Sequence, residues 1–81
     1  MGGVKAYILL VTSIGLEYEI AEEIMKLEDE NTKITVDVVF GEYDLVITVE
    51  GRDLRDIDKL VTNVRRISGV TKTITLISSR G

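Results

Sequence analysis

The order in which two hydrophobic periodicities follow one another constrains the fold of this 81-residue chain more than any other sequence feature. In four segments apolar residues alternate with polar ones or form short runs, which is typical of β-strands. In two others they recur every three or four positions, which is typical of amphipathic helices. The strand segments are 4–12, 32–40, 43–50 and 70–78, and the helical stripes run through 16–27 and 54–67. The predicted order is therefore β-α-β-β-α-β.

This order is that of the split βαβ, or ferredoxin-like, arrangement. It predicts the α+β class, with a four-stranded antiparallel sheet in the order 4-1-3-2 and two helices on one face. The first strand segment, VKAYILLVT, is apolar on both sides, which suits a central strand. We expect residues 1–81 to form a single domain.

Turn and cap residues mark the predicted boundaries. Gly41 and Glu42 are expected to form a tight two-residue hairpin between the second and third strands. Asp53, with Asp56 three residues later, is a candidate N-cap for the second helix. Gly69 is a candidate C′ residue at the end of that helix.

The composition excludes most catalytic chemistry. The chain has no histidine, cysteine or tryptophan, so it lacks the commonest general base, the thiolate nucleophile and the best metal ligands. We therefore predict no enzymatic activity, no metal and no other cofactor. A net charge of −4 and few aromatic residues disfavour binding of nucleic acid. Because the chain has neither a signal-peptide pattern nor a run long enough to span a membrane, we expect a cytoplasmic location.

The sheet face away from the helices is the first candidate functional surface. Threonine presents both a methyl group and a hydroxyl, so a threonine-rich face can pack against protein and keep its hydrogen bonds. We predict a homodimer built by packing two such faces into an α+β sandwich; the alternative is that threonine only reflects strand propensity. By alternation, the predicted interface residues are Thr35, Asp37, Val39, Val46, Thr48, Thr71, Thr73, Thr75 and Ile77, with one side of the first strand.

The segment between the second and third strands is the second candidate. Gly41 permits a positive φ and close access to backbone amides. Glu42 and Asp44 are able to receive an ammonium group, and Tyr43 offers a hydroxyl and a ring face for a cation. The alternative is an ordinary hairpin with a polar tip.

Three runs of the sequence together resemble the Lrp/AsnC transcription regulators. Residues 39–51, VFGEYDLVITVEG, are similar to the hairpin signature of that family, in which a G-x-[YF]-D motif lies at the tip. Residues 67–75, ISGVTKTIT, resemble the end of a helix, a Gly-Val pair and a threonine-rich last strand. Residues 5–11, KAYILLV, are similar to the first strand of the family. The resemblance covers the C-terminal RAM (regulation of amino-acid metabolism) domain, without the winged helix-turn-helix.

The resemblance implies a dimer through open sheet faces, assembly of dimers into an octameric or decameric ring, and an amino-acid effector bound between dimers near the hairpin tip. The function it implies is an effector-binding and oligomerisation module that modulates transcription regulation, with no DNA-binding domain of its own. Because the DNA-binding half is missing, we predict no direct contact with DNA, and the short apolar runs predict no contact with a membrane. The alternative is a ligand-independent module that co-assembles with full-length Lrp/AsnC regulators. On this resemblance the ligand-binding residues are Gly41, Glu42, Tyr43, Asp44, Thr73 and Thr75.

Overall fold

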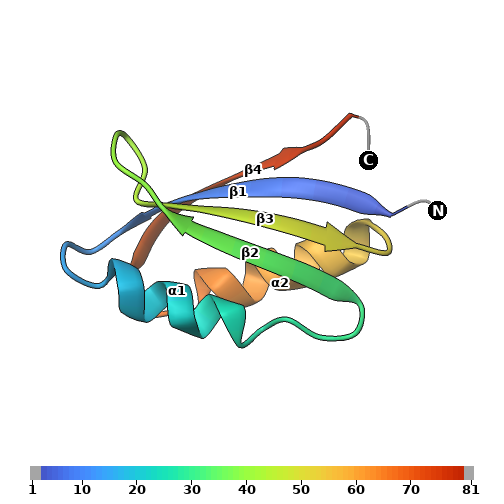
Figure 1. Ribbon diagram of the computed structural model, residues 1–81, viewed down its shortest axis with the longest axis horizontal. Helices are drawn as coiled ribbons and strands as arrows, with labels where there is room; N and C mark the ends of the chain where they lie inside the picture. Colours follow the sequence, from blue (N-terminus) through green and yellow to red (C-terminus); the bar gives the residue numbers. More distant parts are fainter. Residues whose placement is uncertain (1–2, 80–81) are drawn as a thin grey trace.

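The computed structural model describes residues 3–79 and has the predicted order of elements (Figure 1). The elements are β1 (Val4–Thr12), α1 (Glu17–Met25), β2 (Thr32–Val38), β3 (Leu45–Gly51), α2 (Leu54–Arg65) and β4 (Val70–Ile77). The four strands form one antiparallel sheet in the order β2-β3-β1-β4, and both helices lie against the same face of it. The predicted ferredoxin-like fold is confirmed, including the strand order and the central place of β1.

The core lies between this face and the two helices. Along β1 every second residue is buried, and the residues between them are half-buried on the other face. The helices contribute their apolar stripes, as the sequence predicts. Fully burying a Val, Leu or Ile side chain stabilises a fold by about 1.5–3 kcal/mol. The buried apolar residues are Ala6, Ile8, Leu10, Ile20, Ile24, Ile34, Leu45, Ile47, Val49, Ile57, Leu60 and Val64.

The start of α2 has the predicted capping box. Oδ1 of Asp53 accepts hydrogen bonds from the backbone N–H groups of Arg55 and Asp56, at 3.0 and 3.3 Å. In return, Oδ2 of Asp56 accepts one from the Asp53 N–H at 3.4 Å. The hydrogen bond from the Asp56 backbone holds the pKa of Asp53 below its ordinary value. The two carboxylates and the three N–H groups satisfy one another at the point where a helix leaves its amides unpaired.

The end of α2 differs from the prediction. The helix ends at Arg65, with Arg66 as its C-cap, so Gly69 is not the C′ residue. Gly69 lies instead in the turn that leads into β4 and has a φ of +100°. It lies so close to α1 that a Cβ there would be 2.9 Å from Leu16 and 3.0 Å from Ile20. The glycine is needed for this close approach and for the backbone conformation of the turn.

The predicted two-residue hairpin at Gly41 and Glu42 is wrong. Pairing of β2 with β3 ends at Val38 and Leu45, and a longer loop, residues 39–44, joins them. The loop is closed by a hydrogen bond from the Val39 N–H to the carbonyl of Asp44 at 2.9 Å. Phe40, which the alternation placed inside a strand, is fully exposed. Asp44 also donates its own N–H to the carbonyl of Leu10 in β1, so it is bonded on both sides at the base of the loop.

The predicted faces of β4 are also wrong, because a β-bulge interrupts the strand. Thr12 pairs with Val70 and Val11 with Lys72, so Thr71 is an extra residue without a partner opposite. The extra residue moves every later side chain to the opposite face. Register therefore places Thr73, Thr75 and Ile77 beside Leu10, Ile8 and Ala6 on the helix side, and Lys72, Ile74 and Leu76 on the open side.

Candidate functional site

The sheet face away from the helices, called the open face below, is not covered by any described element (Figure 1). Thr35, Asp37, Val46 and Thr48 lie on it as predicted, whereas Val39 lies in the loop beyond β2. By register, the open face consists of Lys33, Thr35 and Asp37 of β2; Val46, Thr48 and Glu50 of β3; Lys5, Tyr7, Leu9 and Val11 of β1; and Lys72, Ile74 and Leu76 of β4.

The middle of the open face is more apolar than the sequence indicated. Leu9 pairs with Val46 on one side and with Ile74 on the other, which forms an apolar row across three strands. In the next row Tyr7 lies between Thr48 and Leu76. Leu76 remains 50% exposed. A contiguous apolar patch of this kind is typical of an interaction surface.

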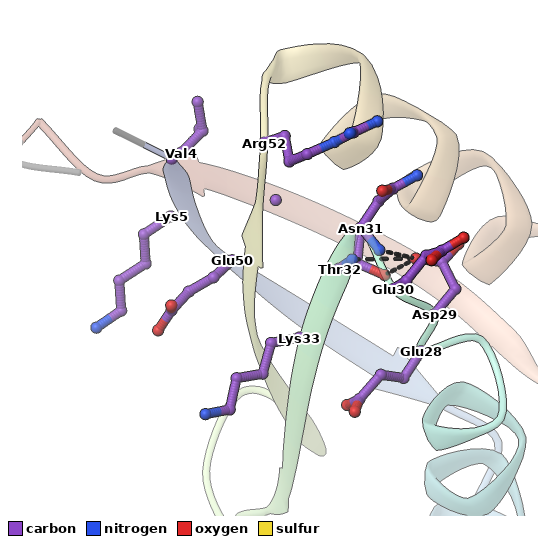
Figure 2. Close-up of a pocket in the computed structure, with 12 residues that line it drawn as sticks. Val4, Lys5, Glu28, Asp29, Glu30, Asn31, Thr32, Lys33, Glu50 and Arg52 are labelled. Atoms are coloured by element: carbon purple, nitrogen blue, oxygen red, sulfur yellow. Dashed lines mark hydrogen bonds between the residues drawn. The ribbon is translucent and has the colours of Figure 1, made fainter. Parts of the chain in front are cut away.

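Charged residues form the row at one end of the open face. Glu50 pairs with Lys5 of β1 and with Lys33 of β2. In the close-up, these three long side chains extend away from Asp29 and Arg52 (Figure 2). The row therefore forms a polar border beside the apolar centre.

The hairpin tip, residues 39–44, is held to the sheet by Asp44. Its N–H donates to the carbonyl of Leu10 at 2.8 Å, and its Oδ2 accepts from the N–H of Thr12, also at 2.8 Å. The carboxylate thus satisfies a β1 amide at the point where strand pairing ends. This Asp is an anchor of the tip, in addition to the ligand-binding role that the family resemblance implies for it.

The remaining predicted tip residues are available at the surface. Gly41 has a φ of +132° and, like Glu42, is exposed. Tyr43 is half-buried, and its ring lies 6.0 Å from the ammonium nitrogen of Lys72. Lys72 was missed as a site residue because only the bulge at Thr71 brings it onto the open side.

The structure does not bring Thr75 to the tip. Thr75 pairs with Ile8 in the middle of β1, and it lines a shallow pocket with Leu54, Ile57 and Val61 of α2 and Ile77. Thr73 lines a different, polar cavity, together with Arg65 and Lys72. Neither threonine lies on the open face, so their predicted interface positions are wrong; their predicted ligand-binding roles stay predictions.

A cleft of about 560 Å³ lies at the opposite end of the sheet from the tip (Figure 2). The carboxylates of Glu28 and Asp29, on one side of the cleft, accept hydrogen bonds from backbone N–H groups. Oδ1 of Asp29 accepts from the N–H groups of Asn31 and Thr32, at 2.8 and 3.0 Å, and from the Thr32 hydroxyl. The hydrogen bond from the Asn31 N–H is the main reason why the pKa of Asp29 lies below its ordinary value. Oε1 of Glu28 accepts from the N–H of Ile34 at 2.9 Å. We interpret this run as structural.

Within residues 3–79, no three or more His, Cys, Asp or Glu side chains lie grouped so that they could hold a metal ion. No helix within the same range has the length and apolar character needed to cross a membrane.

Comparisons with known proteins give a consistent family. No family model matches the chain, and no curated protein matches it. Among solved structures, FFRP-DM1 is 37% identical over 93% of this chain and 97% of its own, with a TM-score of 0.79. Hypothetical protein PHS023 from Pyrococcus horikoshii is 37% identical over 93% of this chain and 88% of its own, with a TM-score of 0.80.

E. coli AsnC shares the fold, with a TM-score of 0.75 at 22% identity. The match covers 96% of this chain and 52% of the AsnC chain, so one part of AsnC corresponds to the fold described here. FFRP-DM1 is an Lrp/AsnC-family protein. Its 37% identity over nearly its full length shows that the chain belongs to the Lrp/AsnC family, as a RAM-like domain.

Proposed function

We propose that the chain is a homodimeric effector-binding and oligomerisation module that modulates transcription regulation and catalyses no reaction. The observation that carries the proposal is the apolar row Leu9, Val46 and Ile74 on an open sheet face. The regulatory part is supported by membership of the Lrp/AsnC family.

Packing two open faces against each other would remove this row from water. Packed sheets lie about 10 Å apart, so the side chains of the two copies interdigitate. Association also suits a domain of this size, because a small core contributes little stability beyond the entropy cost of folding. The hydroxyls of the paired residues Thr35 and Thr48 would keep hydrogen-bonding partners within such an interface.

Two adjacent residues with nearly equal exposure allow a sharp test of this dimer. Leu76 is 50% exposed and lies on the open face, while Ile77 is 48% exposed and lies on the helix side. We expect the wild-type chain to be at least a dimer by light scattering. Leu76→Glu should give a folded monomer, whereas Ile77→Glu should keep the wild-type mass. A wild-type monomer, or equal effects of the two changes, would contradict the proposed interface.

We further propose that a free amino acid binds at the hairpin tip, where dimers meet in an octameric or decameric ring. The tip combines a carboxylate on Glu42, an aromatic ring on Tyr43 and exposed backbone at Gly41. A carboxylate and a ring face both attract an ammonium group. Binding between dimers would couple the effector to assembly by mass action.

The effector proposal is tested by thermal unfolding with each of the twenty amino acids. We expect at least one of them to raise the midpoint, and Glu42→Gln to reduce that rise. The matched control is Glu23→Gln, which removes an exposed carboxylate from α1, outside both the open face and the hairpin tip. No rise with any amino acid, together with binding to a full-length Lrp/AsnC regulator, would favour the ligand-independent module instead.

A further inference from the structure

The charge of this acidic chain is distributed unevenly. Residues 64–81 contain four basic residues and no acidic one, while residues 1–63 contain six basic and fourteen acidic residues. The formal charges of the two parts are therefore +4 and −8. Within the described part of the positive segment, a cavity of about 440 Å³ lies beside the start of β4. It is lined by Arg65, Val70, Thr71, Lys72 and Thr73, so no carboxylate borders it.

Two cationic residues line this cavity, and they come from different elements. Arg65 comes from the last turn of α2, where a cation also complements the helix dipole. Lys72 comes from β4, directly after the bulge, and the dipole of α2 does not account for its position. Neither side chain makes an ion pair within the part of the chain that the structure describes, where the recorded pair is that of Arg55 with Asp53. Two unpaired cations that line one cavity repel each other unless an anion lies between them.

The edge of the sheet supplies a further donor. The Ser78 N–H donates to the carbonyl of Lys5. The N–H groups of the even-numbered residues of β4 therefore point toward β1. Amides alternate in direction along an antiparallel strand, so the N–H of Thr73 is directed away from β1, toward the side on which the cavity lies. The hydroxyl of Thr71 is already used, because it donates to the carbonyl of Val11 at 3.1 Å. The donors left for a ligand are Arg65, Lys72, and the amide and hydroxyl of Thr73.

We propose that this cavity binds a small oxyanion, the phosphate or carboxylate group of a metabolite. A guanidinium provides two parallel donors and an ammonium a compact charge, a combination that suits either group. The site goes beyond the proposed amino-acid site at the hairpin tip, since none of its lining residues lies within residues 39–44. It shares Thr73 with the ligand-binding residues that the family resemblance implies. Lys72 connects the two regions through its contact with the ring of Tyr43. An anion bound here would therefore be able to influence the tip.

The test is calorimetric titration of the chain with inorganic phosphate and, separately, with succinate, at constant ionic strength in chloride. We expect saturable binding of at least one of the two, and the stronger one identifies the anion class. Arg65→Gln and Lys72→Gln should each weaken that binding by about tenfold or more, because each removes a charged hydrogen-bond donor. The matched control is Arg66→Gln, which removes the same charge from the next residue, outside the cavity lining.

The outcomes separate this site from other effects. If the control weakens binding as much as Arg65→Gln does, the anion responds only to overall charge and the proposal is wrong. It is equally wrong if neither anion binds saturably. If the dimer mass and the amino-acid response persist in Arg65→Gln while anion binding is lost, the anion site stands apart from the proposed function. If the wild type is a monomer, or if no amino acid stabilises it, the proposed function is wrong, but the titration still decides whether the anion site exists.

Discussion

At the scale of single residues, Asp44 shows how a motif residue can have a structural role that its motif does not reveal. The sequence singles out the segment of Gly41, Glu42, Tyr43 and Asp44 as a candidate ligand site. It gives no sign that the carboxylate of Asp44 reaches the amide of Thr12, which lies 32 positions earlier in the chain. Contacts over such a separation depend on the assembled sheet, so residue spacing could not have predicted this one.

Replacing Asp44 with alanine should therefore destabilise the fold. The change leaves the part-buried Thr12 N–H without its charged acceptor, and hydrogen bonds to charged groups contribute about 1.5–3 kcal/mol. Urea unfolding should show a lower midpoint with an unchanged slope. Asp44→Asn, which keeps an acceptor oxygen, should lose less. An alanine variant as stable as the wild type would show that the hydrogen bond contributes nothing.

The two carboxylates that cap backbone amides predict how stability depends on pH. The folded chain holds the pKa values of Asp29 and Asp53 below the ordinary value of 3.8, mainly through backbone hydrogen bonds. Between the folded and unfolded pKa values the unfolded chain binds more protons, so stability rises with pH there. Their contribution is complete above the unfolded value and is lost as the pH falls through the folded ones.

We expect the urea midpoint to fall as the pH is lowered from about 5 to about 2. Asparagine caps helices about as well as aspartate but does not titrate, so Asp53→Asn should show a shallower fall. Asp53→Ala should lower the midpoint at neutral pH as well. Identical acid curves for the wild type and Asp53→Asn would rule out Asp53 as a contributor.

At the scale of elements, local patterns predicted the helices and strands well but not every boundary or face. The capping box of α2 and the central place of β1 follow from local patterns, and both are present. The faces of β4 were predicted wrongly, because one unpaired residue at Thr71 reverses the alternation after it. Nothing in VTKTITLI marks a bulge, since a threonine suits a regular strand equally well. The register becomes visible only when β4 is paired with β1.

Gly69 and Gly41 both have a positive φ, but we expect replacement by alanine to destabilise the fold to different degrees at the two positions. At Gly69 a Cβ would be strained by the backbone and would also meet Leu16 and Ile20 at 2.9–3.0 Å. At Gly41 the backbone strain is present, but nothing lies within 4 Å of the added atom. Backbone strain of this kind costs about 1–3 kcal/mol. Gly69→Ala should therefore lower the urea midpoint more than Gly41→Ala does. The reverse order would show that the α1 side chains move aside freely.

At the scale of the whole molecule, the helices cover one face of the sheet and leave the other face open. The helices cover Ala6, Ile8 and Leu10, while Tyr7, Leu9 and Val11 between them remain half-buried on the other side. The two-faced apolarity of β1 was readable from the sequence. The extension of the apolar surface onto Ile74 and Leu76 was not, because it follows from the bulge. The partner that we propose for this surface is a second copy of the chain, because a two-fold interface pairs the same patch on both subunits.

If folding and dimerisation are coupled, stability should depend on protein concentration. A tenfold increase in concentration favours a folded dimer over two unfolded chains by about 1.4 kcal/mol. For a cooperative unit of two such chains, this corresponds to a rise of about 3–5 °C in the thermal midpoint. Leu76→Glu should have a lower midpoint that does not change with concentration, because its unfolding no longer includes dissociation. Ile77→Glu should keep the dependence of the wild type. A wild-type midpoint that is constant over a hundredfold range in concentration would mean that this sheet folds with its open face in water.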